Sequence, residues 1–105
     1  MKEITVLELK KLMDEKADFQ LIDVRREDEF AFANLGGELV ELDAVPDNVE
    51  KFHKEKQVIV HCRSGKRSAD AILYLENNHG FNNLYNLVGG ILAWSDEIDP
   101  GIPKY

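Results

Sequence analysis

One cysteine, Cys62, lies in a short segment that is rich in cations. Three basic side chains, Arg63, Lys66 and Arg67, follow it within five residues. A thiol acts as a nucleophile only as the thiolate, and nearby cations lower the pKa of a cysteine from about 8.5 to between about 3.5 and 7.5. Burying such a cationic segment in an apolar core would be costly. We therefore interpret Cys62 as a reactive thiol rather than a small core residue, and we predict a thiolate at neutral pH.

The residues around Cys62 are typical of a turn between a strand and a helix. The apolar run 57–61 predicts a buried strand, and the pattern over 68–78 predicts a helix. In such a turn, small residues allow several backbone N–H groups to point at one centre, and the positive end of the helix dipole adds to their effect. Hydroxyl donors are available from Ser64 and Ser68. The pattern predicts a substrate-binding loop made of Arg63, Ser64, Gly65, Lys66 and Arg67, with Ser68 in support.

The rest of the chain alternates strands with helices. Further strands are predicted at Ile4 and over 19–24, 38–42 and 83–87. Further helices are predicted after the Thr5-x-x-Glu8 capping box to about Lys16, over 27–34, from Pro46 to about His53, and from Gly89-Gly90 to about Ile98. Strands that are nearly continuous apolar runs favour a parallel sheet covered on both faces. We expect one α/β domain over residues 1–105, with three layers, about five parallel strands and an extended tail over 99–105.

In folds of this class, sites lie at the carboxyl ends of the strands. Asp23 and Arg25 end a neighbouring strand, and we interpret them as a structural pair that braces the loops, with a direct role in substrate binding as the alternative. Strand alternation predicts that His61 points away from Cys62 and acts as scaffold rather than as a catalytic aid. We expect Gly89-Gly90 to form a tight turn beside the loop, and Trp94 to line the core or a pocket.

Composition excludes several classes of protein. The 105 residues include 20 acids and 13 Lys or Arg, for a net charge of −7, which argues against a nucleic-acid partner. The charge is uneven, because five bases face one acid between Lys54 and Arg67. No apolar run is long enough for a membrane span, and no secretory signal is recognisable, so we expect a cytoplasmic protein without a membrane partner and with a reduced thiol. The residues His53, His61, Cys62 and His79 lack metal-ligand spacing, and we predict neither a metal nor a cofactor.

Three segments resemble the single-domain rhodaneses, the rhodanese-like sulfurtransferases. Leu21–Arg25 resembles the family's Asp-x-Arg strand end, Val60–Ser68 its active-site loop, and Leu87–Trp94 its Gly-Gly…Trp signature. One segment departs from the family pattern. Where the family often has Gly-His-Ile-Pro-Gly-Ala, this chain has Ala33-Asn34-Leu35-Gly36-Gly37-Glu38. That change puts the shape of this turn and its contacts in question, but not the nucleophile.

The resemblance implies a three-layer rhodanese-like fold and a ping-pong reaction. Cys62 would take a sulfane sulfur from a small anionic donor such as thiosulfate and form a persulfide. Cyanide or a thiol, for example on a thioredoxin-like or biosynthetic protein, would then accept the sulfur. Arg63 and Lys66 would bind the donor, and Arg67 would close the loop.

Two other functions stay open. Related folds use longer Cys-x5-Arg loops for phosphatase or arsenate reductase chemistry, whereas Cys62 to Arg67 is Cys-x4-Arg, a narrower ring without an Asp that could protonate a leaving group. A non-catalytic binding module of the same fold is the second alternative. A nucleotide phosphate loop is excluded at Gly65-Lys66, because Val60 occupies the position of its first glycine.

Overall fold

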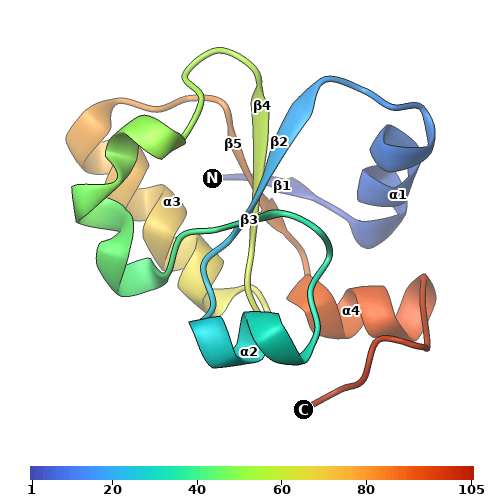
Figure 1. Cartoon of the computed structure of the whole chain (residues 1–105). Coiled ribbons are helices and arrows are strands. Elements are labelled where there is room, and N and C mark those ends of the chain that lie inside the picture. Colours follow the sequence, from blue (N-terminus) through green and yellow to red (C-terminus); the bar gives the residue numbers. More distant parts are fainter.

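The computed structural model describes all residues from 1 to 105. A parallel five-stranded sheet runs through its centre, with helices packed on both faces (Figure 1). The strands are β1 (Lys2–Ile4), β2 (Phe19–Asp23), β3 (Glu38–Leu39), β4 (Gln57–His61) and β5 (Leu84–Leu87). The α-helices are α1 (Val6–Asp14), α2 (Glu27–Phe32), α3 (Lys66–His79) and α4 (Gly90–Glu97). Two 3-10 helices, η1 (Leu42–Asp47) and η2 (Val49–Lys51), complete the fold. The predicted three-layer α/β architecture is therefore confirmed.

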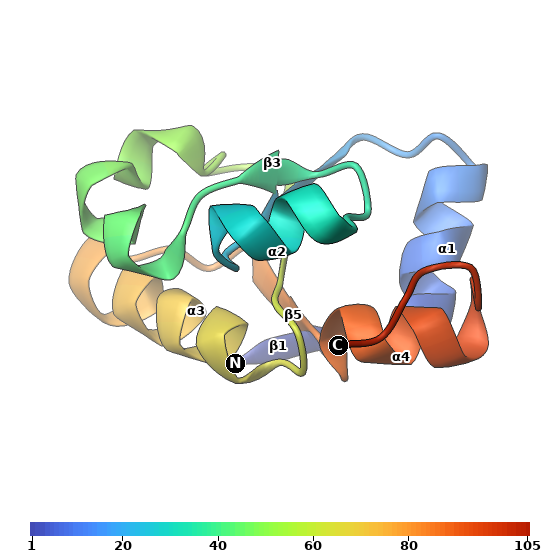
Figure 2. The same ribbon diagram turned by 60° about the horizontal axis from the view of Figure 1, so that its bottom comes forward.

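The strand order is β1-β5-β4-β2-β3, and every pair of neighbours is parallel. The strand that precedes Cys62, β4, is the middle one. Helices α1 and α4 lie on one side of the sheet, while α3 and the 3-10 helices lie on the other (Figure 1). When the lower end of the molecule is turned forward, α2 and the first turns of α3 and α4 gather at the carboxyl ends of the strands (Figure 2). The topology thus brings three predicted segments together at the carboxyl-terminal end of the sheet: the loop after β4, the Asp23–Arg25 strand end and the Gly89-Gly90 turn.

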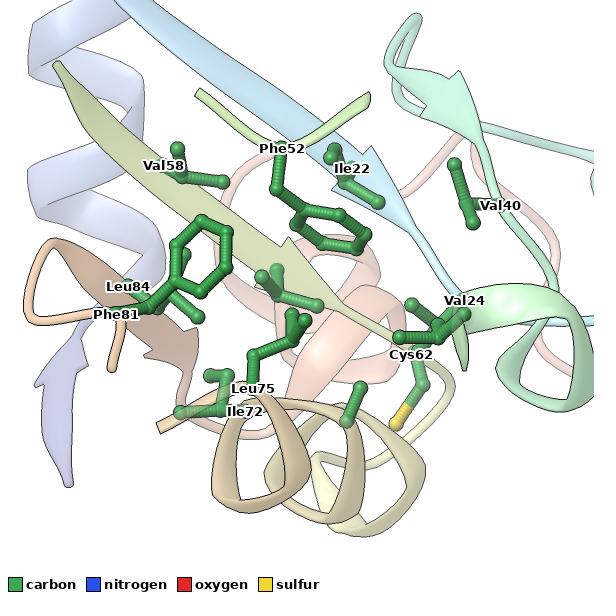
Figure 3. Close-up of a cluster of buried hydrophobic side chains, with 13 residues drawn as sticks. Ile22, Val24, Val40, Phe52, Val58, Cys62, Ile72, Leu75, Phe81 and Leu84 are labelled. Atoms are coloured by element: carbon green, nitrogen blue, oxygen red, sulfur yellow. The ribbon is translucent and has the colours of Figure 1, made fainter. Parts of the chain in front are cut away.

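Alternation along β4 divides the core into two clusters. Val58, Val60 and Cys62 belong to the cluster beneath α3, in which the Cys62 sulfur points toward that helix (Figure 3). Ile59 belongs to the opposite cluster, which also contains Trp94 at 7% exposure, so the prediction that Trp94 lines the core is confirmed. Each fully buried aliphatic side chain contributes about 1.5–3 kcal/mol to the free energy of unfolding. The strand that carries the thiol is therefore anchored on both faces.

Helix α1 begins at the predicted capping box. The Glu8 N–H donates to Thr5 Oγ1 at 3.1 Å, and the Thr5 N–H donates to Glu8 Oε1 at 2.9 Å. Two backbone donors that would otherwise lack partners are thereby satisfied. No helix of the structure is both long enough and apolar enough to cross a membrane.

The segment between β3 and β4 differs from its prediction. The predicted helix from Pro46 to His53 is wrong, because the chain forms the two short 3-10 helices, and Pro46 lies inside η1 rather than in a first α-helical turn. Proline has no N–H to donate, so Pro46 interrupts regular helical hydrogen bonding at its position. The predicted strand over 38–42 is also shorter, since regular pairing ends at Leu39. Beyond it, isolated backbone bonds from Val40 to Asp23 and from Leu42 to Val24 keep the chain beside β2.

The tail is not extended throughout. Residues 99–102 form a turn, in which the Ile102 N–H donates to the Asp99 carbonyl and the Gly101 N–H donates to the Asp99 side chain. The Ser95 hydroxyl donates to the Ile102 carbonyl at 2.6 Å and fixes this turn on α4. The chain then runs back to the carboxyl edge of the sheet, where it ends beside α2 (Figure 2).

Candidate active site

The loop after β4 wraps around the Cys62 sulfur. The residue is 1% exposed, and its Sγ accepts backbone hydrogen bonds from Gly65 at 3.1 Å and from Ser68 at 3.4 Å, with the Ser68 hydroxyl oxygen also at 3.4 Å. Burial raises the pKa of the Cys62 thiol, but the hydrogen bonds from Ser68, Gly65 and Ser64 outweigh burial, and the pKa lies below its ordinary value. The site is therefore built to hold negative charge on sulfur.

Two glycines give the loop its shape. Gly65 has a φ of 112°, a conformation that residues with a side chain rarely adopt. Gly90, at the start of α4, has a φ of 58°, and a Cβ there would lie 2.5 Å from the carbonyl oxygens of both Cys62 and Arg63. The absence of that atom lets the Ile91 N–H donate to the Cys62 carbonyl at 3.0 Å. The predicted Gly89-Gly90 turn beside the loop is confirmed, and it joins α4 directly to the loop backbone.

Arg67 forms an ion pair with Glu29, which no sequence pattern assigned to the site. Its two terminal nitrogens donate to the Glu29 carboxylate at 2.7 and 3.0 Å. Glu29 is 5% exposed, and it also accepts from the Tyr105 hydroxyl at 2.6 Å and from the Arg26 N–H at 3.1 Å. The hydrogen bonds from Arg67 are the main reason that the pKa of Glu29 lies far below its ordinary value of 4.5. Arg67 thus joins α3 to α2.

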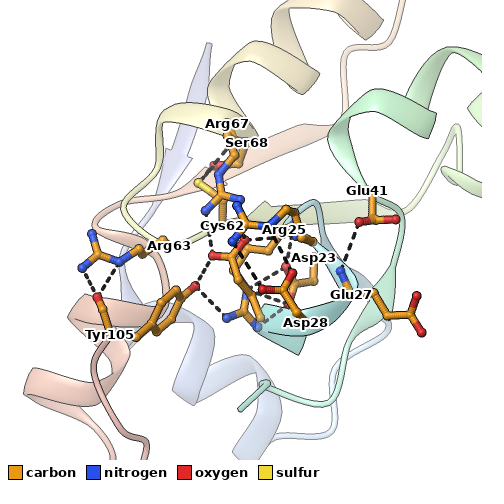
Figure 4. Close-up of polar contacts among 12 residues, drawn as sticks. Asp23, Arg25, Glu27, Asp28, Glu41, Cys62, Arg63, Arg67, Ser68 and Tyr105 are labelled. Atoms are coloured by element: carbon orange, nitrogen blue, oxygen red, sulfur yellow. Dashed lines mark hydrogen bonds and ion pairs between the residues drawn. The ribbon is translucent and has the colours of Figure 1, made fainter. Parts of the chain in front are cut away.

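Arg63 is engaged by the tail. Its Nε donates to the main-chain oxygen of Tyr105 at 2.7 Å, and its guanidinium lies 5.1 Å from the centre of the Tyr105 ring. Figure 4 shows Tyr105 lying between Arg63 and the side chains of α2. No sequence pattern pointed to Tyr105. The contact between Arg67 and Glu29 could have been anticipated only from charge. The acidic first turn of α2 lies opposite a cationic loop and contains Glu27, Asp28 and Glu29.

Two predicted loop residues are exposed to solvent. Lys66 and Ser64 are exposed. No ion pair is formed by Lys66. Of the three cations that follow Cys62, only Lys66 therefore keeps its charge free of a protein partner.

The Asp23–Arg25 pair is fully buried. Arg25 donates to the Asp23 carboxylate through Nε at 3.0 Å and Nη2 at 2.7 Å, and its remaining donors reach the Tyr105 hydroxyl at 2.9 Å and the Ala33 carbonyl at 2.7 Å. This pair connects β2 to the loop after α2 and to the tail. Its contacts agree with a bracing role, since every Arg25 donor group is used by the protein itself.

His61 lies on the face of β4 opposite to Cys62, beside Asp23 in the neighbouring strand. Its Nε2 is 3.7 Å from Asp23 Oδ2, and neither ring nitrogen has a hydrogen-bond partner. Burial lowers the pKa of His61, against the opposing effect of Asp23, so the ring is neutral and the short approach is not an ion pair. This placement matches the predicted orientation away from the thiol.

The turn that departs from the family pattern is closed by Asn34. Its Oδ1 accepts from the Gly36 N–H at 2.8 Å, and its Nδ2 donates to the Phe30 carbonyl at 3.1 Å. Gly36 has a φ of 86°, and a Cβ at Gly37 would lie 2.8 Å from the Leu21 carbonyl oxygen. An asparagine turn and two glycines thus provide a tight connection to β3 without histidine or proline.

A cleft of about 540 Å³ opens beside the loop. Arg67 forms part of its wall, whereas Cys62 does not. The lining carries both signs of charge, from Arg25, Arg26 and Arg67 and from Glu41, Asp43 and Asp47. Its volume suits a small ligand.

Comparison with known proteins gives consistent matches. A family model described as a rhodanese-like domain matches residues 5–97. The putative sulfurtransferase YtwF of Bacillus subtilis is 33% identical over 95% of this chain and 96% of its own length. A rhodanese-like/PpiC domain-containing chloroplast protein of Arabidopsis thaliana is 37% identical over the whole chain, which spans 38% of that protein.

A solved structure agrees with these sequence matches. The rhodanese-like domain protein from Staphylococcus aureus superimposes with a TM-score of 0.83 at 37% identity, covering 100% of this chain and 99% of that one. The fold, the position of the loop and the match over residues 5–97 lead to one conclusion: this chain belongs to the rhodanese-like domain family.

Proposed function

We propose that the protein is a sulfurtransferase that moves a sulfane sulfur through a persulfide on Cys62. The observation that carries the proposal is the ring of donors around the sulfur, with Gly65 N–H at 3.1 Å and Ser68 N–H at 3.4 Å. Backbone donors aimed at one sulfur favour the thiolate in the resting state. They would equally favour the anionic terminal sulfur of a persulfide.

In the first half-reaction, the Cys62 thiolate attacks the outer sulfur of a small anionic donor. With thiosulfate, a new S–S bond forms to Cys62, the sulfur–sulfur bond of the donor breaks, and sulfite leaves with the electron pair. Lys66 is exposed and without an ion pair, so we assign it the main role in attracting the donor. The cleft beside Arg67 would hold the donor or the leaving sulfite.

In the second half-reaction, a thiophilic nucleophile attacks the terminal sulfur and Cys62 leaves as the thiolate. Cyanide becomes thiocyanate, and a thiolate becomes a persulfide. We propose a small thiol or the thiol of a thioredoxin-like or biosynthetic protein as acceptor. We propose that the reaction takes place in the cytoplasm, where thiols are kept reduced.

The six-residue loop favours sulfur transfer over phosphatase or arsenate chemistry. The backbone N–H groups of Gly65 and Ser68 are directed at a single sulfur atom, and Arg67 is held by Glu29 rather than free to bind a phosphoryl group. A non-catalytic module would have no need for a thiol with a lowered pKa.

Turnover assays test the proposal. We expect the purified protein to produce thiocyanate from thiosulfate and cyanide, to lose that activity completely in Cys62→Ser, and to leave p-nitrophenyl phosphate intact. Phosphate release that depends on Cys62, or thiocyanate production that survives Cys62→Ser, would overturn it. A panel of polysulfide and persulfide donors with thiol acceptors would then identify the preferred pair.

A further inference from the structure

The hydroxyl of Ser68 lies between two groups that cannot both receive its proton. Its oxygen is 3.4 Å from the Cys62 sulfur and 2.5 Å from Oδ1 of Asn86, on β5. Ser68 is fully buried, and Asn86 is 5% exposed. Since a hydroxyl has one proton, its direction decides what the thiol experiences.

The amide of Asn86 is oriented by its other contact. Its Nδ2 donates to the Gly65 carbonyl at 3.0 Å, which leaves Oδ1 facing Ser68. An amide oxygen only accepts hydrogen bonds. The Ser68 hydroxyl must therefore donate to Asn86 in this arrangement, and it presents a lone pair to the sulfur.

A lone pair suits a thiol and opposes a thiolate. The thiol can donate its S–H to the Ser68 oxygen, completing a chain from Cys62 through Ser68 to Asn86. A thiolate has no proton to donate, so the hydroxyl must turn from Asn86 to the sulfur in order to stabilise it, and only in that orientation does the Ser68 side chain lower the pKa of Cys62. We propose that Asn86 is a positioning residue that holds the Ser68 proton away from Cys62 and thereby favours the thiol over the thiolate.

This effect opposes the backbone donors without cancelling them. The N–H groups of Gly65 and Ser68 donate to the sulfur whichever way the hydroxyl points. Asn86 therefore moderates the acidity of Cys62. The inference concerns the ionisation of Cys62, so it can be tested whether or not sulfur transfer is the reaction of this thiol.

The charged groups near the sulfur come from other elements and are untouched by a change at Asn86. Arg67 of α3 interacts electrostatically with Cys62 and is paired with Glu29 of α2. Arg63, which follows Cys62 in the loop, is held by Tyr105 of the tail. A titration shift in an Asn86 variant would thus arise from the Ser68 hydroxyl or from the Gly65 contact.

The variant Asn86→Leu distinguishes these two origins by the direction of the shift. Loss of the contact to Gly65 alone would loosen the loop and raise the thiol pKa. Release of the Ser68 proton lowers it, by about one unit, because a hydrogen bond to a charged group is worth roughly that much. We expect the midpoint of iodoacetamide alkylation against pH to fall by about one unit in Asn86→Leu.

The double variant Ser68→Ala with Asn86→Leu tests whether the Ser68 proton causes the shift. If the proton of Ser68 carries the effect, Asn86→Leu should no longer lower the midpoint when Ser68 is alanine. Asn83→Leu is a matched control, because Asn83 immediately precedes β5 and also has low exposure, yet its amide donates to the carbonyls of His53 and Lys56. Its midpoint should equal that of the wild type.

A rise of the midpoint in Asn86→Leu, or the same shift in the Ser68→Ala background, would overturn the proposal. A second measurement needs no variant at Asn86. Proton NMR of the wild type should show a Ser68 hydroxyl resonance with a contact to the Asn86 side chain at low pH, which changes as Cys62 titrates. A Ser68 hydroxyl resonance that lacks the contact to the Asn86 side chain at low pH would also overturn the inference.

Discussion

Replacing Glu29 by glutamine should destabilise the protein in a way that depends on pH. The carboxylate accepts four hydrogen bonds, two from Arg67 and one each from Tyr105 and the Arg26 N–H. A glutamine amide keeps one oxygen but turns an NH2 group toward donors, so about two of these bonds are lost and Arg67 remains partly buried without its partner. Hydrogen bonds to charged groups are worth about 1.5–3 kcal/mol each, and Arg67, with a side chain 28% exposed, recovers part of this from water. We expect the free energy of unfolding at pH 7 to fall by about 2–4 kcal/mol.

The pH dependence follows from the direction of the pKa shift. The pKa of Glu29 is lowered in the folded protein, chiefly by Arg67, from an ordinary value of 4.5. Its contribution to stability is therefore complete above that ordinary value and is lost progressively as the pH falls toward the lowered pKa. Urea unfolding should show a constant difference between wild type and Glu29→Gln above about pH 5.5, and a shrinking difference below about pH 4.5.

Glu27→Gln is the matched control, because Glu27 lies in the same first turn of α2 and is exposed. It removes the same charge near the same helix end and should change the stability by less than about 0.5 kcal/mol. A stability difference for Glu29→Gln that equals that of Glu27→Gln, or that does not diminish in acid, would refute the assigned ion pair.

Two other substitutions test the loop. Gly90→Ala places a methyl group against the carbonyls of Cys62 and Arg63 at a positive φ, so we expect it to lower stability by more than about 2 kcal/mol and to slow alkylation of the thiol. Gly36→Ala, at a positive φ in open space, should lower the free energy of unfolding by only about 1–2 kcal/mol and leave alkylation unchanged. Equal effects in the two variants would contradict the close approach of α4 to the loop backbone. Lys66→Gln should raise the KM for thiosulfate several-fold with little change in kcat, and the rise in KM should be largest at low salt. The control Lys11→Gln, at an exposed position on α1, should change neither KM nor kcat. An unchanged KM in Lys66→Gln would show that Lys66 does not bind the donor.

The sequence was informative where structure depends on local patterns. The apolar run of β4 and the small residues after Cys62 predicted a strand, a turn and a helix at the correct places, because each depends on neighbouring residues alone. The Thr5–Glu8 capping box is of the same kind. Strand alternation also placed Cys62 and His61 on opposite faces of the sheet.

Prediction failed where contacts between distant segments decide the structure. The chain after β3 continues beside β2 through single backbone bonds, and the buried side chains of Val45 and Phe52 hold the 3-10 segments against the core. Apolar spacing over such a short segment does not distinguish a 3-10 helix from an α-helix. Pro46 alone predicts a helix start, whereas in the structure it lies inside η1, where it has no N–H to donate.

The cations of the loop were identified from sequence, but their partners were not. Arg67 meets Glu29 and Arg63 meets Tyr105 across separations of 38 and 42 residues. Those pairings give Arg63 and Arg67 partners within the protein and leave Lys66 as the unpaired cation, while the predicted substrate-binding roles stay predictions. Asn86 was similarly missed, because within a strand its side chain gives no sign of the serine that the fold brings to it.

The central claim is that Cys62 carries the transferred sulfur. Mass spectrometry of the intact protein after brief exposure to thiosulfate, followed by peptide mapping, tests it most directly. The account predicts a gain of one sulfur atom located on Cys62, its removal by cyanide, and no gain in Cys62→Ser. An unchanged mass under conditions in which thiocyanate is produced would contradict it.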